Sequence, residues 1–97
     1  MVELEVDQDN SCIQIKGKLI QTTVMSAHKI FQNLAQSPRD WKIDFSQVTQ
    51  VDSCALALLI EWKKTSRNQS SKIKFQHLPK ALISIANLSQ VEDLILQ

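Results

Sequence analysis

Glycine is almost absent from this 97-residue chain, in which Gly17 is the only example. A phosphate-cradling loop or a dinucleotide-binding turn needs several glycines, because the backbone must approach the ligand closely. The sequence therefore excludes a nucleotide site of either kind.

Excess charge, cysteine and long apolar runs are also scarce. The formal net charge is +1, which gives no general attraction to nucleic acid or to an anionic membrane. No apolar run approaches the roughly 18–20 residues that a membrane-spanning helix needs. The acidic, alternating start of the chain is the opposite of a signal peptide. We therefore expect a cytoplasmic protein without a membrane span or a nucleic-acid partner, in which Cys12 and Cys54 stay reduced.

The apolar content is sufficient for one hydrophobic core. Hydrophobic residues make up 43% of the chain and charged residues 22%, which is ordinary for a globular domain. A chain of this length forms one domain but not two. We predict a single domain over residues 1–97.

Hydrophobic periodicity predicts the elements in the order β-β-α-β-α-β-α. Alternation at residues 2–6 and 12–16 predicts an antiparallel hairpin that turns at Asp9-Asn10. Helical spacing and turn residues predict the later elements. These are a helix capped by Thr22 or Thr23 and stopped by residues 37–40, a strand at 41–45 followed by a polar turn, a helix from Ser53 to the polar loop 66–71, a strand at 73–75, a helix opened by Pro79, and a last short helix at 91–96.

The order of the elements also predicts the sheet. Helical connections between the last three strands imply parallel neighbours with right-handed crossovers, whereas the first strand adds an antiparallel partner. Because the first two strands alternate cleanly, one face of the sheet should be wet. The expected fold class is α/β, a four-stranded mixed sheet with helices packed mainly on one face.

The helix from Ser53 is more apolar than a small domain requires. One stripe should meet the sheet and consists of Leu56, Leu59 and Ile60, with Lys63 at its edge. A second stripe lies on nearly the opposite side and consists of Ala55, Leu58 and Trp62. The sequence leaves two interpretations open: this stripe packs against a neighbouring helix, or Leu58 and Trp62 belong to a partner-binding patch.

The Asp52-Ser53 pair that opens this helix is the strongest candidate site. Both residue types are good helix caps, worth about 1 kcal/mol. Backbone N–H groups and the helix dipole also favour negative charge at this position. A phosphate on Ser53 would therefore sit on the helix N-terminus beside the charge of Asp52, and at a contact surface it could switch binding off.

The remaining candidates for chemistry are weak. Neither His28 nor His77 has neighbours at metal-ligand spacing, and His28 is expected at the edge of the core. A triad of Ser53, His77 and a carboxylate would lack an oxyanion loop or nucleophile elbow. We therefore expect a non-catalytic protein without cofactor or metal.

Basic residues gather in the second half of the chain. They are Lys63, Lys64, Arg67, Lys72, Lys74 and Lys80. Because no nucleic-acid-binding signature accompanies them, we expect a solvated face. Contact with acidic groups on a partner or with lipid headgroups stays open as an alternative.

Two segments resemble the STAS domain family, which includes the bacterial anti-sigma-factor antagonists. Residues 48–53, Val-Thr-Gln-Val-Asp-Ser, followed by Ala-Leu-Ala-Leu-Leu at 55–59, resemble the signature loop and helix of that family. The length, the order of elements and the ending at 85–94 agree, so the resemblance covers nearly the whole chain. Within the family the likeness is greatest to the MlaB branch, the small STAS subunits of the Mla phospholipid-transport ABC complexes of Gram-negative bacteria.

The resemblance implies a function and a contact surface. It implies a non-catalytic subunit at the cytoplasmic face of the inner membrane, which binds and supports the ATPase subunit and, through it, the permease and lipid-binding subunits. Such a complex maintains the lipid asymmetry of the outer membrane. The contact residues implied are Asp52, Ser53, Cys54, Ala55, Leu58 and Trp62.

The same family implies an alternative, an anti-sigma-factor antagonist that is switched by phosphorylation of Ser53. A third interpretation is a regulatory module of another transporter or sensor. The chain departs from the family at Cys54-Ala55, where a small residue and then glycine are usual. Without the backbone freedom of glycine a partner has less room to approach, which favours a permanent hydrophobic contact over kinase docking.

Overall fold

The computed structural model describes residues 2–34, 40–68 and 72–90. The seven predicted elements there follow in the predicted order. They are β1 (Val2–Asp7), β2 (Cys12–Leu19), α1 (Val24–Leu34), β3 (Trp41–Val51), α2 (Ser53–Asn68), β4 (Ile73–Gln76) and α3 (Lys80–Leu88). The short helix predicted at 91–96 lies outside the described residues. Of the described helices, none is both long and apolar enough to cross a membrane.

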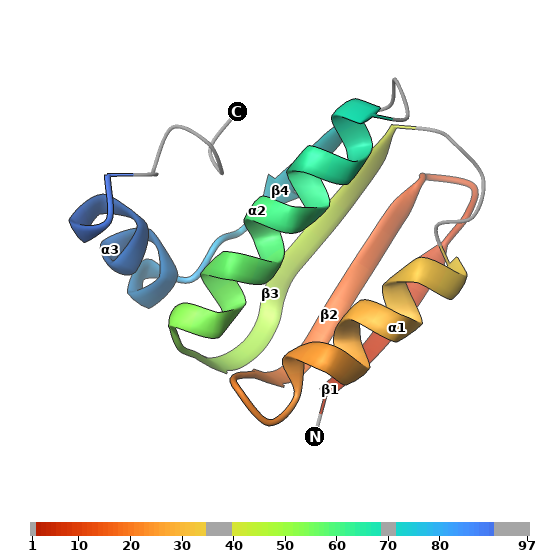
Figure 1. Cartoon of the computed structure of the whole chain (residues 1–97). Helices are drawn as coiled ribbons and strands as arrows, with labels where there is room; N and C mark the ends of the chain where they lie inside the picture. Colours follow the sequence, from red (N-terminus) through yellow and green to blue (C-terminus); the bar gives the residue numbers. More distant parts are fainter. Residues whose placement is uncertain (1, 35–39, 69–71, 91–97) are drawn as a thin grey trace.

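The sheet has the predicted topology. Its strand order is β1-β2-β3-β4, with β1 antiparallel to β2 and the other two pairings parallel. Helices α1 and α2 lie side by side over one face, and α3 lies beyond α2 near the end of β4 (Figure 1). The mixed sheet with helices mainly on one face is therefore confirmed.

Strand β3 is longer than predicted. The expectation of a polar turn after Phe45 is wrong, because the strand continues to Val51. The β2–β3 register shifts twice: Gln14 pairs with Asp44 whereas Lys16 pairs with Gln47, and a second shift follows Gly17. Gly17 has a φ of 94° there, which a side chain would disfavour. These bulges hide the strand from a search for strict alternation.

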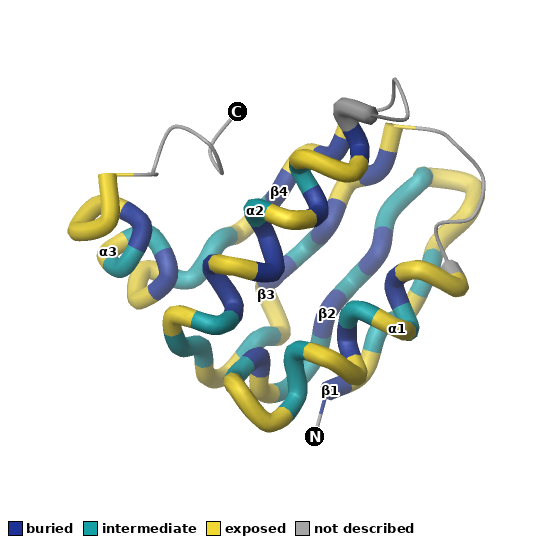
Figure 2. Tube along the Cα trace, in the orientation of Figure 1, coloured by how far each residue is buried: buried dark blue, intermediate teal, exposed yellow. Residues whose placement is uncertain are grey.

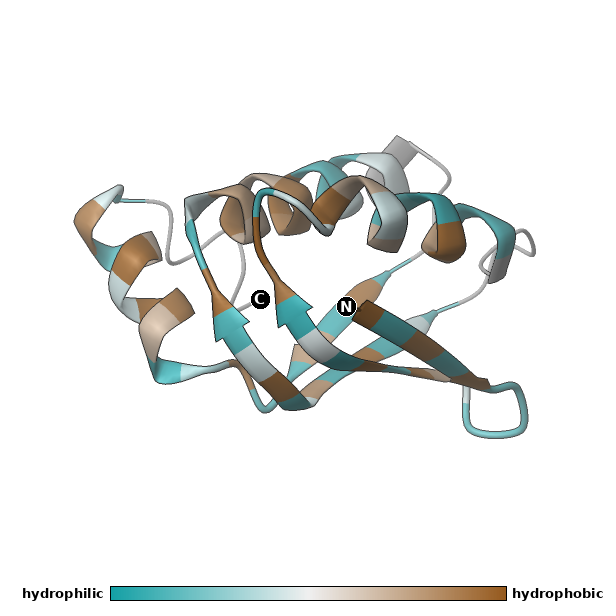
Figure 3. Cartoon of the chain, turned by 90° about the horizontal axis from the view of Figure 1, so that it is seen from below, coloured by the Kyte–Doolittle hydropathy of each residue, from teal (hydrophilic) through white to brown (hydrophobic). Residues whose placement is uncertain are grey.

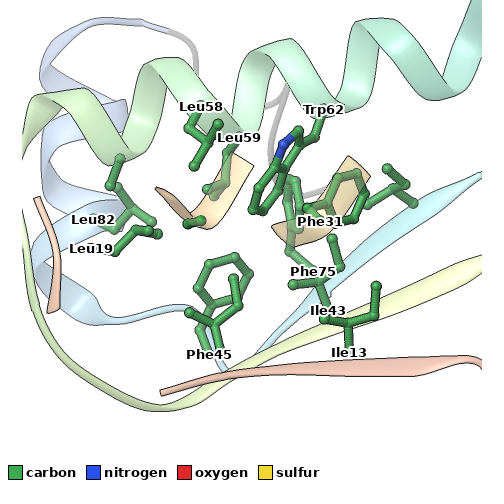
Figure 4. Close-up of a cluster of buried hydrophobic side chains, with 14 of the residues drawn as sticks. Ile13, Leu19, Phe31, Ile43, Phe45, Leu58, Leu59, Trp62, Phe75 and Leu82 are labelled. Atoms are coloured by element: carbon green, nitrogen blue, oxygen red, sulfur yellow. The ribbon is translucent and has the colours of Figure 1, made fainter. Parts of the chain in front are cut away.

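The core lies between the sheet and the two helices above it (Figures 2 and 4). Burial of each large apolar side chain stabilises the fold by roughly 1.5–3 kcal/mol. The rings of Phe45 and Phe75 meet edge to face, with centroids 5.6 Å apart. The largest fully buried side chains come from all layers: Ile13, Ile15, Leu19, Ile43, Phe45, Leu59, Trp62 and Leu82.

Both apolar stripes of α2 are buried inside the chain. The Trp62 side chain is only 1% exposed and stacks on Phe31 of α1, with ring centroids 4.3 Å apart. Its Nε1–H donates to His28 Nδ1 at 3.0 Å. The stripe therefore packs against the neighbouring helix, and the placement of Trp62 in an exposed partner-binding patch is wrong.

The basic residues divide into two groups, apart from Arg67, whose side chain lies outside the described part of the chain. Lys63 is half-buried: its Nζ donates to the Ile73 carbonyl and lies 5.0 Å from the centre of the Phe75 ring. The Lys63 side chain therefore covers the edge of the core, with its ammonium group over the Phe75 ring. The solvated face predicted for the group is found at Lys64, Lys72, Lys74 and Lys80, which are exposed.

Candidate functional site

Asp52 is the only residue between β3 and α2, and its side chain joins two segments of the chain. Oδ1 accepts a hydrogen bond from the Cys54 N–H at 2.9 Å, which is the capping contact predicted for it. Oδ2 accepts a hydrogen bond from the Gln21 N–H, also at 2.9 Å. Asp52 therefore fixes the start of α2 against the loop that leads into α1, and both carboxylate oxygens are used inside the chain.

The loop before α1 is held by Thr23. Its hydroxyl donates to the Lys18 carbonyl at 2.7 Å and accepts the Ile20 N–H at 2.9 Å. Thr23 immediately precedes the helix as predicted, but its hydroxyl binds backward into the loop rather than forward to the helical N–H groups. This network brings the first turn of α1 beside the first turn of α2.

Ser53 is the first residue of α2 and is exposed. Within the described part of the chain its hydroxyl has no hydrogen-bond partner, so Ser53 is not the cap. It presents a hydroxyl to solvent at the positive end of a 16-residue helix, beside the Asp52 carboxylate. A partner or a modifying enzyme can reach this group without unfolding any part of the site.

An apolar groove lies between the N-terminal halves of α1 and α2. It has a volume of about 470 Å³, and its lining is almost entirely apolar. One wall comes from α1, where Met25 is 64% exposed. Glu61 supplies the one acidic side chain of the lining. The lining residues are Val24, Met25, His28, Cys54, Ala57, Leu58 and Glu61.

Ser53 stands directly beside this groove. It precedes the lining residue Cys54 by one position and the exposed Ala57 by one helical turn, so Ser53 and Ala57 share a face of α2. Ser53 does not itself line the groove, but its exposed hydroxyl borders it. The site combines an apolar slot with one polar group at its end.

His28 forms part of the groove and connects it to the core. Its Nδ1 accepts the hydrogen bond from Trp62, so the neutral ring carries its hydrogen on Nε2. The predicted place of His28 at the edge of the core is confirmed by its half-buried position. His28 and Trp62 therefore set the spacing of the two helices that form the groove.

A family model described as "Mlab, STAS domain" matches residues 3–97. The chain belongs to the STAS domain family. No curated protein sequence gives a significant match. The structure of a putative anti-sigma factor antagonist from Thermotoga maritima is similar to it with a TM-score of 0.77 at 11% identity, over 99% of this chain and 84% of that one. The unphosphorylated anti-sigma factor antagonist SpoIIAA is similar with a TM-score of 0.66, also at 11% identity, over 91% and 83%.

The STAS fold brings some of the predicted contact residues to one surface and buries others. Ser53 is exposed and Cys54 is half-exposed at the groove, whereas Leu58 contributes only a largely buried wall. Ala55 is 0% exposed and Trp62 1% exposed, so neither side chain is available to a partner. Helical spacing identified the apolar stripes correctly but could not say which of them α1 covers.

Sequence reasoning missed the contribution of α1 to the site. Met25 and Ala57 were not singled out, although each is exposed in the groove. For Met25 the available signal was a large apolar residue that falls outside the apolar stripe of its helix. Ala57 gave no signal, because alanine is frequent on every face of a helix.

A second polar group lies at the far end of the sheet. Asp44 Oδ1 is 3.1 Å from His77 Nδ1 and also accepts the Ser46 N–H at 2.8 Å. Burial raises the pKa of the Asp44 carboxyl, but the hydrogen bonds from Ser46 and His77 outweigh it, so the pKa lies below its ordinary value of 3.8. Among the described residues, no three His, Cys, Asp or Glu side chains are grouped so that they could hold a metal ion.

The two cysteines are free thiols in different environments. Cys54 lines the groove, whereas Cys12 points to the helix-free side of the sheet. Burial, followed by the charges of Asp44 and Asp7, raises the pKa of the Cys12 thiol. Cys12 is therefore held in its less reactive protonated form.

Proposed function

We propose that this STAS domain is a non-catalytic subunit of an ABC-type phospholipid transporter, and that it binds and supports the ATPase subunit through the α1–α2 groove and Ser53. The observation that carries the proposal is the apolar groove beside an exposed hydroxyl. An apolar slot bordered by polar groups is the form of a protein-docking site. The match to a family model named for MlaB supports the transporter branch.

The groove supports a permanent contact rather than catalysis. Its lining offers Glu61 and His28 as polar side chains, and His28 is already bonded to Trp62. An apolar helix or loop of the partner would fill the slot and remove Met25 from water. In this proposal the partner is the ATPase at the cytoplasmic face of the inner membrane, and the complex serves outer-membrane lipid asymmetry.

The test is recovery of the partner from cells. The tagged chain is purified from detergent-solubilised cells, and co-purifying proteins are identified by mass spectrometry. Wild type should recover an ABC ATPase with its permease. Ser53→Glu should lose them, because it places a charge at the end of an apolar contact. Ser84→Glu, an identical change at an exposed position of α3, should keep them.

Ser53→Ala tests whether the hydroxyl itself is needed for folding or for partner binding. Because the Ser53 hydroxyl caps nothing, this variant should unfold like wild type and still recover the ATPase. If Ser53→Glu recovers the ATPase as well as Ser84→Glu does, the proposed contact surface is wrong.

A second candidate is an anti-sigma-factor antagonist that is switched by phosphorylation of Ser53. The observation that favours it is the exposed hydroxyl at the start of α2, together with folds shared with two proteins described as such antagonists. This candidate predicts that the same purification recovers a serine kinase and that Ser53 carries phosphate. Recovery of an ATPase and permease with unmodified Ser53 would reject it.

A further inference from the structure

The face of the sheet opposite α1 and α2 is not covered by any of the described helices (Figure 3). Its outward side chains enclose an open hollow of about 520 Å³. The hollow mixes charged and amide side chains with the half-buried Cys12, whereas the Val6 side chain packs on the core face opposite Ile13. This face is therefore polar, and it lies on the side away from the groove.

Charge is distributed unevenly across this face. The exposed side chains of β1 are acidic, namely Glu3, Glu5 and Asp7. The register places Asp7 opposite Cys12, Cys12 opposite Lys42, and Lys42 opposite Lys74. One row thus runs from a carboxylate on the edge strand β1 to two ammonium groups, one on β3 and one on the edge strand β4.

The two lysines are an unfavourable pair within a single chain. Lys42 and Lys74 are both exposed and directly opposite each other on neighbouring strands. Neither forms an ion pair with another residue in the described ranges. Like charges at opposed positions destabilise a sheet. The hydrogen bonds that Asn10 donates to Asp7 lower the pKa of that carboxyl and keep it negative at the other edge.

We propose that a second copy of this chain docks on this face, with the two-fold axis parallel to the strands. Such an axis lays β1 of one copy over β4 of the other and repeats every contact twice. Because the axis preserves each row of the sheet, Asp7 meets Lys74 of the second copy and Glu5 meets Gln76. An axis across the strands would instead place β1 on β1, acid against acid.

The size of the face predicts a weak dimer. Four strands at about 4.8 Å spacing give a strip roughly 20 Å wide, which is at the lower end of protein interfaces. Association should therefore depend on concentration and weaken with salt. The α1–α2 groove lies on the other layer and stays open in the dimer, so this proposal does not rest on the proposed transporter function.

Charge reversal on purified full-length chain tests the proposal. The acidic-edge variant is Glu5→Lys with Asp7→Lys, and the basic-edge variant is Lys42→Glu with Lys74→Glu. Each places like charges at both symmetric contacts, so self-association should be at least about tenfold weaker than that of wild type. An equal mixture of the two variants has opposite charges at both contacts and should associate again. Sedimentation velocity over a concentration series at low salt measures all four samples.

Three results would overturn the proposal. The first is a wild-type chain that stays monomeric at the highest concentration, and the second is a basic-edge variant that associates as strongly as wild type. The third is a mixture that stays monomeric although circular dichroism shows both variants folded. Because Asp7→Lys removes the acceptor of the Asn10 turn, Lys74→Glu alone serves as a further variant, which brings like charges to both contacts with the turn intact.

Discussion

Trp62 holds the two helices of the groove at a fixed separation. Its ring stacks on Phe31, and its Nε1–H is bonded to His28. A buried aromatic pair of this kind stabilises the fold through the apolar area that it buries and through the stacking of its rings. The hydrogen bond to His28 satisfies the indole N–H, which would otherwise be buried without a partner. Rigidity of the groove therefore depends on a residue that no partner can touch.

Trp62→Ala should destabilise the chain by about 3–5 kcal/mol, because it leaves a large cavity between α1 and α2. Trp62→Phe keeps a ring against Phe31 and loses the hydrogen bond, so it should cost less. Urea unfolding followed by circular dichroism measures both. A Trp62→Ala variant as stable as wild type would contradict the observed packing.

Both carboxylate oxygens of Asp52 accept hydrogen bonds inside the chain and hold the start of α2 in position. Asp52→Ala removes the α2 cap and the contact with Gln21, and should cost about 1–2 kcal/mol. Asp52→Asn keeps an oxygen for Cys54 but turns an amide toward the Gln21 N–H, so an intermediate loss is expected. If Asp52→Ala and wild type had the same free energy of unfolding in the same measurement, these hydrogen bonds would not contribute to stability.

At the level of elements, the extension of β3 determines where α2 begins. The strand passes through two bulges, and Asp44 supports the first by accepting the Ser46 N–H. Asp52 is then the whole connection to α2. Because a single residue separates β3 from α2, the end of β3 fixes the position of Ser53 beside the groove.

Asp44 should make stability depend on pH in the acid range. The pKa of its carboxyl is lower in the folded chain than its ordinary value of 3.8. Its contribution is thus fully present above that value and is lost as the pH falls through the lower folded-state pKa. The stability difference between wild type and Asp44→Asn should shrink as the pH falls below about 4. A difference that stays constant between neutral pH and pH 3, measured by urea unfolding, would contradict this assignment.

Elements with strong periodicity were predictable from the sequence. Alternation identified β1 and β2, and helical spacing identified α1, α2 and α3. The continuation of β3 to Val51 was not predictable, because bulges break the two-residue period. At the start of α2, the capping role predicted for Asp52 is confirmed, whereas Ser53 does not cap the helix. The burial of Trp62 was not predictable, because its cover comes from Phe31, distant in the sequence.

At the scale of the whole molecule, two surfaces lie on opposite layers. The groove is formed by helices and is apolar, whereas the open face of the sheet is charged and polarised from β1 to β4. A second exposed apolar side chain, Leu88 of α3, is 87% exposed and does not line the groove. It therefore provides a matched control for substitutions in the groove.

Met25→Lys should weaken partner binding, and Leu88→Lys should not. Both changes exchange one exposed apolar side chain of a helix for a cation, so their effects on solubility and folding are comparable. Only Met25→Lys places the charge in the apolar slot, where it should reduce affinity by about tenfold or more.

The most direct test of the docking surface is calorimetric titration of the purified ATPase subunit with wild type, Met25→Lys and Leu88→Lys. We predict that wild type and Leu88→Lys bind with the same affinity, and that Met25→Lys binds far more weakly while unfolding at the same denaturant concentration as Leu88→Lys. A wild-type chain that does not bind the ATPase, or equal affinities for all three, would contradict the proposal that the α1–α2 groove is the ATPase contact.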